Sequence, residues 1–357
     1  MKKVVIIGGG FAGAYAAQHL ERDFDVTLID LKDYFEFTPG ILRTIVEPEH
    51  IKNIQVLHTH YLKRARFIRA EVKTVTPKYV LFDGKRVPYD YLLICSGSRY
   101  HTPFKEKRIV LSTRAEHLRQ YYDQLCKAKD ILIIGGGVVG VELAAEIATH
   151  CKKEKGRGKT ITIAHAHDRF LTRNNQKAID FAERFLTKHG VKIMYNERVM
   201  SHNGKTFITE SGKKIKADLA FLCTGIQSNS GFMKKHFAKK LNEREQIEVN
   251  AFLQVEGSKN IFVCGDVNNS HEEKTAQSAE KQAMIAVENL YRLEQHSAHS
   301  THPAQQSLVA YYPTKKPMVI SLGKWCGIFV WGRFTWCGVL PGILKNLVEW
   351  KTMIQYR

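Results

Sequence analysis

The chain has 357 residues and a formal net charge of +19, and hydrophobic residues make up 44% of it. This length accommodates two domains of ordinary size and a further segment around a substantial core. The charge predicts an anionic partner. Two local basic runs, within 152–159 and 234–240, are typical of solvated loops rather than of a nucleic-acid platform. Nucleic acid is therefore disfavoured as a partner.

The seven cysteines contain no Cys-x-x-Cys pair and no regular spacing. A first strand that begins at Lys2 leaves no charged-then-apolar leader before it. We therefore expect a cytoplasmic protein in a reducing compartment, without disulfides or a zinc site. The polar segment 295–302 is interpreted as a mobile link, and its histidines lack acidic or cysteine neighbours. We predict no metal site there or elsewhere.

Two glycine-rich fingerprints are the most informative feature of the chain. They read Gly8-Gly9-Gly10-Phe11-Ala12-Gly13 and Gly135-Gly136-Gly137-Val138-Val139-Gly140. Each follows an apolar β-branched run and opens a helix-like stretch, which is the context in which such a motif binds a dinucleotide pyrophosphate. Glycines that only permit helix–strand packing are the alternative for either motif alone. The pair indicates two bound dinucleotides, a flavin and a nicotinamide.

The first unit runs from a strand at 4–7 through a helix at 12–21 to a strand at 26–29. It ends on Asp30, at the spacing where the fingerprint places a carboxylate on a ribose 2′-OH. Alternating segments within 67–82 then lead to an apolar run at 91–98, which is interpreted as a strand that returns to the first sheet.

A second unit of the same kind begins at Asp130 and closes near Gly225. A late apolar run, 260–266, ends on Asp266 and is followed by a helix over 275–293. These late elements fit the first sheet, so the second domain is predicted to be inserted in the first. The predicted limits are an FAD-binding domain at 1–105 and 236–300, an NAD(P)H-binding domain at 106–235, and a C-terminal segment at 301–357.

The C-terminal segment is apolar and aromatic, and it contains all four tryptophans, from Trp325 to Trp350. It is too short and too interrupted by charges to span a bilayer. Apolar residues recur at helical spacing from Ile343, with basic residues between them. We expect a helix that lies on an anionic membrane surface and gives a quinone access to the flavin. Packing against the flavin domain and a homodimer interface are the alternatives, and docking on one face is compatible with lipid on the other.

Four segments carry a resemblance to known families: 30–39, 140–146, 275–282 and 350–353. The segments Cys223-Thr-Gly225 and Cys264-Gly-Asp266 add to the two fingerprints. Together these features resemble type II NADH:quinone oxidoreductases. The chain resembles still more closely the ferroptosis-suppressor branch of the apoptosis-inducing-factor family. The resemblance extends over nearly the whole chain. It implies an α/β fold of two Rossmann-like dinucleotide-binding domains, and a peripheral membrane enzyme that passes hydride from NADH or NADPH to FAD and two electrons to a membrane quinone.

The resemblance also implies site residues. Those expected at FAD are Gly8, Gly10, Phe11, Ala12, Gly13, Asp30, Lys32, Arg43, Val72, Ser96, Gly97 and Asp266. Those expected at NAD(P)H are Gly135, Gly137, Val138, Val139, Gly140, Glu142, His165 and Gly225. The expected catalytic residues are Glu142, beside the nicotinamide, and Gln277, Lys281 and Gln282, on a quinone-facing helix. A helix-start acid and surface polar positions are the plainer interpretations of these four.

Two departures qualify the resemblance. Lys281 stands where type II dehydrogenases usually have glutamine, and His165 stands where an acid is expected, as it does in the ferroptosis-suppressor branch. His165, with His167 and Arg169 close by, offers donors and, when protonated, positive charge, which predicts weak discrimination between NADH and NADPH.

Three other functions are alternatives. Disulfide reductases are disfavoured because no redox cysteine pair follows the opening of the first domain. For a sulfide:quinone oxidoreductase, Cys326 and Cys337 are the candidate cysteines, but the intact second fingerprint favours a nicotinamide donor. The last alternative is a slow flavoprotein redox sensor that binds nucleic acid or a protein partner.

Overall fold

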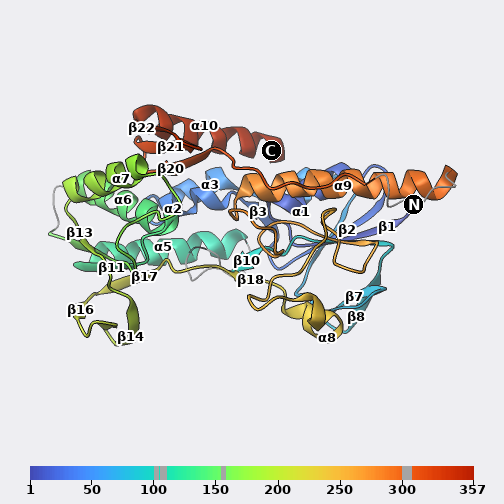
Figure 1. Ribbon diagram of the computed structural model, residues 1–357, viewed down its shortest axis with the longest axis horizontal. Coiled ribbons are helices and arrows are strands. Elements are labelled where there is room, and N and C mark those ends of the chain that lie inside the picture. Colours follow the sequence, from blue (N-terminus) through green and yellow to red (C-terminus); the bar gives the residue numbers. More distant parts are fainter. Residues whose placement is uncertain (100–103, 105–110, 154–157, 300–307) are drawn as a thin grey trace.

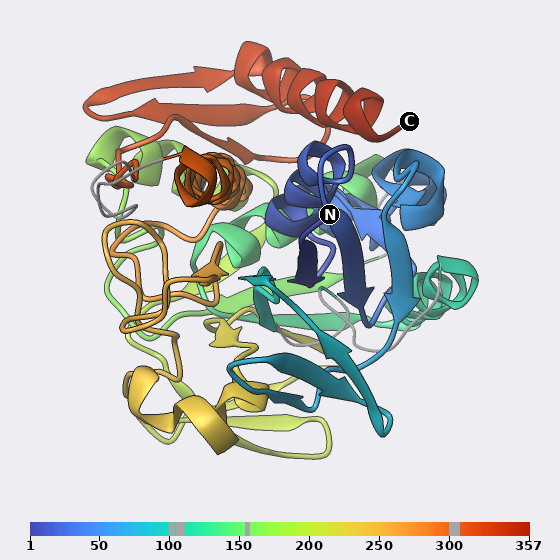
Figure 2. The ribbon, with the colours of Figure 1, turned by 90° about the vertical axis from the view of Figure 1, so that its right-hand side faces the viewer.

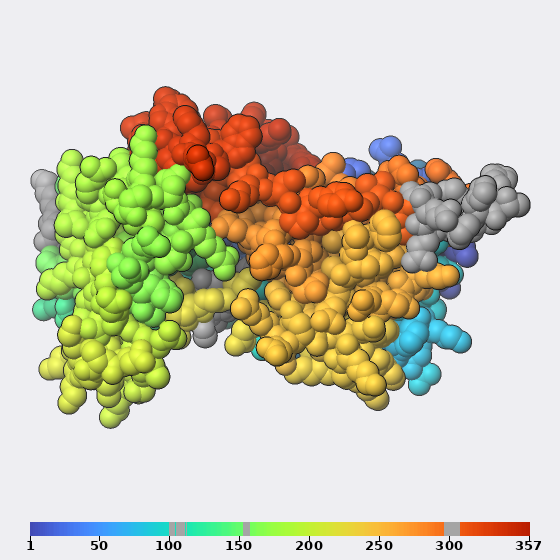
Figure 3. Space-filling view, viewed as in Figure 1, coloured from blue at the N-terminus to red at the C-terminus, as the bar shows by residue number. Residues whose placement is uncertain are grey.

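The computed structural model describes residues 1–99, 104, 111–153, 158–299 and 308–357. Figure 1 shows two lobes side by side, with a third layer formed by the C-terminal elements along one edge of both. In the space-filling view a notch separates the two lobes beneath that layer (Figure 3).

The first lobe is built on a parallel sheet whose strands come from distant parts of the chain. Its order is β19-β9-β1-β2-β5. The strands are β1 (Lys3–Ile7), β2 (Asp25–Asp30), β5 (Arg66–Arg69), β9 (Tyr91–Ile94) and β19 (Ile261–Val263). Helices α1 (Phe11–Leu20) and α9 (Ala276–His299) pack against each other. The buried face of α1 is made almost entirely of alanine and glycine, which lets the two helices approach closely.

Smaller elements surround this sheet. They are β3 (Tyr34–Glu36) with β4 (Gln55–Leu57), the meander β6 (Thr74–Val75), β7 (Tyr79–Phe82) and β8 (Lys85–Pro88), and the short helices α2 (Ile41–Thr44), α3 (Ile51–Ile54), α4 (His58–Tyr61) and α8 (Lys234–Phe237).

The second lobe repeats the parallel design with the order β13-β12-β11-β17. Its strands are β11 (Asp130–Ile134), β12 (Thr160–Ala164), β13 (Val191–Met194) and β17 (Leu219–Leu222), and its helices are α5 (Leu111–Lys127), α6 (Val138–Lys153) and α7 (Gln176–Lys188). A three-stranded antiparallel sheet projects from it, with β14 (Val199–Asn203), β15 (Thr206–Thr209) and β16 (Lys214–Lys216).

The chain completes the second sheet at β17 before it rejoins the first sheet at β19. The two segments that cross between the lobes pair with each other as β10 (Ser98–Arg99) and β18 (Gln227–Ser228). The predicted fold, with one dinucleotide domain inserted in the other, is confirmed. The domain limits given above stay a prediction.

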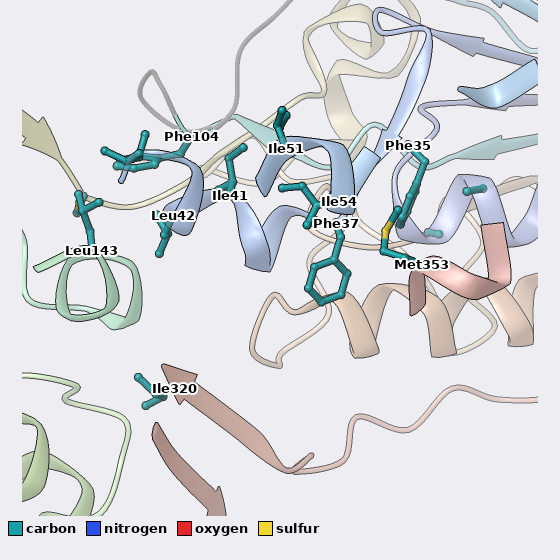
Figure 4. Close-up of a cluster of buried hydrophobic side chains, with 14 of the residues drawn as sticks. Phe35, Phe37, Ile41, Leu42, Ile51, Ile54, Phe104, Leu143, Ile320 and Met353 are labelled. Carbon is teal, nitrogen blue, oxygen red and sulfur yellow. The ribbon is translucent and has the colours of Figure 1, made fainter. Parts of the chain in front are cut away.

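The C-terminal layer consists of the antiparallel strands β20 (Met318–Ser321), β21 (Gly327–Trp331) and β22 (Phe334–Gly338), followed by α10 (Val339–Tyr356). Figure 2 shows this layer lying above α9 and α1. The main hydrophobic core is continuous through all three parts, as Figure 4 illustrates with Phe35 of the first lobe, Leu143 of the second, and Ile320 and Met353 of the layer. One face of the C-terminal segment is therefore docked on the dinucleotide domains.

The interpretation of residues 295–302 as a link is wrong for its first part. Helix α9 continues to His299, which is six residues past its last large apolar residue, Leu293. Residues 300–302 lie outside the described residues. No helix within the described ranges is long and apolar enough to cross a membrane.

Candidate functional site

The first fingerprint forms a cradle whose glycines serve two different purposes. A side chain at Gly8 or Gly13 would overlap with the backbone of Cys95 or of Gly8, so these two glycines are required by packing. A side chain at Gly10 would meet nothing within 4 Å. Gly10 precedes the first residue of α1, and no side chain caps this helix start. The exposed N–H groups at this helix start, next to open space, fit the pyrophosphate of FAD.

Asp30 ends β2 beside this cradle. Its carboxylate accepts the Gly9 N–H through Oδ2 and the Lys32 N–H through Oδ1, the latter at 3.0 Å. His58 is fully buried, and its Nε2 lies 3.8 Å from Asp30 Oδ2. Burial raises the pKa of the Asp30 carboxyl, but the neighbouring His58 ring and Lys32 outweigh this effect and hold the pKa below its ordinary value. The carboxylate is therefore ionised and able to accept ribose hydroxyls.

Asp266 follows β19 and lies near the end of β9. Ser98 donates its hydroxyl to Asp266 Oδ2 at 2.5 Å, and the preceding Gly265 has a φ of +85°. Ser96 donates to the Asn229 carbonyl at 2.7 Å, which ties the first crossing segment to the second. Ser98 was not predicted, although it belongs to the same Ser-Gly-Ser sequence as Ser96 and Gly97.

The remaining predicted FAD residues are divided between cradle and core. Phe11 and Ala12 form the first turn of α1, and Gly97 has a φ of +62°. The Lys32 ammonium lies 5.2 Å from the centroid of the Tyr34 ring, and Val72 is buried in a second apolar cluster. Arg43 is buried at the interface with the second lobe, described below.

The second fingerprint reproduces the first cradle. A Cβ at Gly135 would lie 2.6 Å from the Cys223 carbonyl oxygen, and one at Gly140 would overlap with Gly135. A side chain at Gly137 would again meet nothing within 4 Å. Val138 and Val139 open α6, and Gly225 has a φ of +60°. This cradle fits the pyrophosphate of a second dinucleotide.

His165 occupies the place that Asp30 has in the first lobe. The Gly136 N–H donates to His165 Nδ1 at 3.0 Å, just as the Gly9 N–H donates to Asp30. Burial, with a smaller effect of His167, lowers the pKa of His165. A ring that accepts at Nδ1 and is neutral carries its proton on Nε2. At neutral pH His165 therefore offers a hydrogen-bond donor and carries no charge, and any positive charge at this site comes from its neighbours.

Glu142 lies in the first turns of α6 and is held from outside its own domain. Its Oε1 accepts the Ser321 N–H at 2.7 Å, the Ser321 hydroxyl at 3.1 Å and the Lys345 ammonium at 2.5 Å. The Lys345 ammonium also donates to the Ser321 hydroxyl at 2.9 Å. The sequence could not show these contacts, because about 180 to 200 residues separate the partners.

Glu146, one turn further along α6, extends this interaction to the first lobe. Its Oε1 lies 3.4 Å from Arg43 Nε, and Arg43 Nη1 donates to Asn346 Oδ1 of α10 at 2.9 Å. Burial raises the pKa of the Glu146 carboxyl, and the charges of Arg43 and Lys345 oppose this effect. The buried charged strip, defined as Arg43, Glu146, Lys345 and Glu142, thus joins the two lobes and the C-terminal layer.

The three polar residues assigned to the predicted quinone-facing helix, α9, do not lie on one face of it. Gln277 and Lys281 are exposed, whereas Gln282 is buried. Gln282 accepts the Gly265 N–H at 2.7 Å and donates to Glu272 at 2.6 Å. Its amide is therefore occupied next to Asp266, and the structure gives it a positioning role instead of contact with a substrate.

A second lysine near this helix was not predicted. Lys316 donates to the Ser278 hydroxyl at 3.0 Å and lies 3.6 Å from Glu272. Burial lowers the pKa of Lys316. The negative charge of Glu272 opposes this effect, and the positive charge of Lys281 adds to it. Lys281 and Lys316 therefore place two cationic side chains beside the exposed side of α9. Within the described part of the chain, no group of three or more histidine, cysteine, aspartate or glutamate residues could hold a metal ion.

The model of the pyridine nucleotide-disulphide oxidoreductase family matches residues 2–283. The chain belongs to this family. It is 33% identical over 350 residues to apoptosis-inducing factor homolog B of Dictyostelium discoideum, a match that covers 92% of this chain and 89% of that one. It is 29% identical over 377 residues to ferroptosis suppressor protein 1 of Homo sapiens, covering 99% and 96%. The predicted family resemblance is confirmed.

Solved structures show the same fold at low identity. NDH2 from Plasmodium falciparum in complex with NADH superimposes with a TM-score of 0.81 at 16% identity, covering 99% of this chain and 96% of that one. The sulfide:quinone oxidoreductase from Aquifex aeolicus gives a TM-score of 0.80 at 20% identity, covering 99% and 92%. These structures show the fold, and membership of the family makes the chain a flavin-dependent oxidoreductase with FAD and NAD(P)H as its cofactors.

The open space beside Gly10 leads to a prediction about cofactor retention. The Gly10→Val variant is expected to fold with a melting temperature within a few degrees of the wild type as apoprotein, because a Cβ at this position meets no protein atom within 4 Å. It should lose FAD at least about tenfold more readily, since the side chain would occupy the pyrophosphate position. FAD content after dialysis measures this loss. Gly231→Val is the control, because a Cβ at Gly231 also meets nothing within 4 Å and the φ of this glycine is not positive. Full FAD retention by the Gly10 variant would contradict the assignment.

The neutral His165 predicts how nucleotide choice depends on pH. Efficiencies with NADH and NADPH should differ by no more than about tenfold, or about 1.4 kcal/mol. Because the folded pKa of His165 is lowered, the ring stays neutral above about pH 6.5, the ordinary histidine value. The NADPH-to-NADH ratio of kcat/KM should therefore be flat from about pH 7 upward and rise only below the ordinary range. A preference for NADH beyond about a hundredfold, or a ratio that already changes near neutral pH, would refute this account.

Proposed function

We propose that the protein is an NAD(P)H:quinone oxidoreductase that works at a membrane surface. The observation that carries this proposal is the pair of open dinucleotide cradles with Glu142 held rigidly in the first turns of the second helix. FAD, when bound, accepts a hydride from the nicotinamide and passes two electrons to an acceptor. The chain itself binds the two nucleotides, orients them and supplies the acceptor site.

Glu142 is assigned to orienting the nicotinamide ring. Its carboxylate is fixed by Ser321 and Lys345, which restricts it to one position beside the second cradle. A fixed polar group can lower the activation barrier by holding a reactant in the productive geometry. Gly137 leaves room for the nucleotide backbone at the same helix start.

The acceptor is assigned to the exposed side of α9. Gln277 and Lys281 lie one helical turn apart there, with Met284 exposed one turn further on. The ammonium of Lys281 can donate a hydrogen bond to a quinone carbonyl oxygen where related dehydrogenases have glutamine.

Membrane association is assigned to the outer side of the C-terminal layer. Its apolar surface consists of Trp331, Phe334, Trp336, Val339, Leu340, Ile343, Leu347, Trp350 and Ile354, all of them exposed. The residues on α10 recur every three or four positions, so they form one continuous stripe. A water-exposed stripe of this length is unusual for a soluble surface and suits a helix lying in a lipid interface.

The cysteines do not favour a sulfide:quinone oxidoreductase. Burial raises the pKa of both Cys326 and Cys337. Thiols with raised pKa values are mostly protonated at neutral pH and attack weakly. Cys337 belongs to β22, and its thiol lies near Lys177 and Arg184 of α7. The acceptor is assigned to a different element, α9.

Replacing Glu142 tests its assigned role. Glu142→Gln keeps the shape of the side chain but removes the charge that Lys345 pairs with. We expect flavin reduction by NADH in rapid-mixing experiments to slow by about tenfold or more, with FAD content unchanged. Glu210→Gln, at an exposed carboxylate on the projecting sheet, is the control. An unchanged rate in the Glu142 variant would remove this residue from the proposal.

Replacing exposed residues of α10 tests the membrane assignment. Trp350→Ser combined with Ile354→Ser should reduce binding to lipid vesicles by about tenfold or more, because both side chains lie in water in the free protein. Reduction of a long-chain quinone in vesicles should fall in parallel, while reduction of a small soluble quinone persists. Met200→Ser, at another exposed apolar side chain, should change neither. Normal vesicle binding by the α10 variant would contradict the assignment.

Steady-state turnover separates this proposal from a slow redox sensor. A quinone oxidoreductase oxidises NADH continuously when a soluble quinone is present. A sensor would form a long-lived reduced complex with little turnover. Nucleic-acid binding by such a sensor would weaken linearly with the logarithm of the salt concentration.

A further inference from the structure

A basic cavity of about 570 Å³ lies where the end of α1 meets the end of α10. Its lining includes His19 and Arg22 from the α1 region, Lys63 and Arg64 from the segment after α4, and Gln355 from α10. Neither the dinucleotide cradles nor the acceptor side of α9 contains these side chains. Figure 2 shows the end of α10 above α1.

The backbone that presents the two basic residues of the 63–64 segment is held by a buried carboxylate. Glu21 accepts the N–H groups of Lys63 and Arg64 at 2.9 and 2.8 Å, and that of Ala65 at 2.9 Å. Glu21 also lines the cavity, and these hydrogen bonds direct its carboxylate toward the 63–65 backbone. Arg64 also donates to the Arg22 carbonyl at 3.4 Å, which joins the segment to the end of α1. The cationic groups thus stand on a rigid base.

The cavity is rigidly connected to α10. Tyr61, which also lines it, packs against Tyr356 with 5.1 Å between ring centroids. His60 binds the Arg357 carbonyl at 2.9 Å, and Arg357 Nη2 donates to the carbonyl oxygens of Lys52 and Asn53, both at 3.1 Å. The position of the cavity relative to the apolar stripe is therefore fixed. Ile354 of that stripe directly precedes Gln355 of the cavity wall.

The charge balance of the cavity is positive. Three permanent cations, Arg22, Lys63 and Arg64, line it, together with one histidine. Of the nearby acids, Asp23 accepts the Tyr291 hydroxyl at 2.8 Å. Glu280 of α9 interacts electrostatically with His19 and Lys351. An anion is the ligand that such a cavity favours, and arginine binds phosphate oxygens in pairs.

We propose that this cavity binds the phosphate group of an anionic phospholipid whose acyl chains lie along the apolar stripe of α10. Arg22, Lys63 and Arg64 are its phosphate ligands. The proposal rests on the membrane association proposed above, and it adds a site for one headgroup to what that proposal describes as a surface. The choice of a lipid over a free anion follows from the position of the cavity at the end of α10, the helix that carries the stripe and contributes Gln355 to the cavity wall.

The experiment compares two variants that lose the same charge. Arg22→Gln with Lys63→Gln removes two ligands of the cavity. Lys214→Gln with Lys216→Gln removes two exposed lysines of β16, which lies in the projecting sheet away from α10 (Figure 1). Binding to vesicles of phosphatidylcholine, with and without phosphatidylglycerol, is measured by sedimentation. FAD content verifies that each variant is folded.

The wild-type protein and the β16 variant should prefer vesicles that contain phosphatidylglycerol. The cavity variant should lose about thirtyfold of this preference, equivalent to about 2 kcal/mol, and bind pure phosphatidylcholine normally. An unchanged preference in the cavity variant would overturn the site and leave the membrane proposal intact. Absence of wild-type binding to any vesicle would overturn both.

Inorganic phosphate distinguishes the two sources of the anion. Calorimetric titration with inorganic phosphate is carried out at the same ionic strength for the wild type and the cavity variant. Phosphate binding that is lost in the variant, together with an unchanged vesicle preference, would assign the cavity to a free phosphate and overturn the lipid proposal. Loss of the vesicle preference supports it.

Discussion

The buried charged strip constrains the arrangement of the whole molecule. Removing ionised groups from water is costly unless each has a close partner of opposite charge. Glu142 and Glu146 both lie buried on α6, and their partners come from elsewhere: Arg43 from the first lobe and Lys345 from the C-terminal layer. The second helix start is therefore completed only when all three parts are assembled. The layer that exposes an apolar stripe outward therefore holds the Glu142 carboxylate inward, through Ser321 and Lys345.

The two lobes have different side chains at equivalent positions beside their fingerprints. In each, a glycine N–H in the fingerprint donates to a side chain at the end of the neighbouring strand, Asp30 in one and His165 in the other. The ionised Asp30 suits a ribose with free hydroxyls. The neutral His165 neither attracts nor strongly repels a 2′-phosphate. This difference explains why two copies of one motif can hold different nucleotides.

Sequence reasoning found the parts of the site that depend on local backbone. The fingerprints, Asp30 and Asp266 are each placed by a strand that ends and a helix that begins within a few residues, and such short-range patterns are visible in the sequence. The fold followed, since two such units with a late returning strand permit few arrangements. The contacts of Glu142 with Ser321 and Lys345 depend on tertiary packing, and nothing local signals them. For the same reason Gln282 was grouped with Gln277, although helical rotation buries it beside Gly265.

The central claim is that two nucleotides act together on this chain, with hydride entering from the nicotinamide side. An absorption spectrum of the purified protein, recorded anaerobically before and during titration with NADH, tests this claim most directly. The account predicts a flavin spectrum that is bleached in a single two-electron step. A protein that purifies without colour and cannot be reconstituted with FAD, or a bound flavin that NADH and NADPH both fail to reduce, would contradict it.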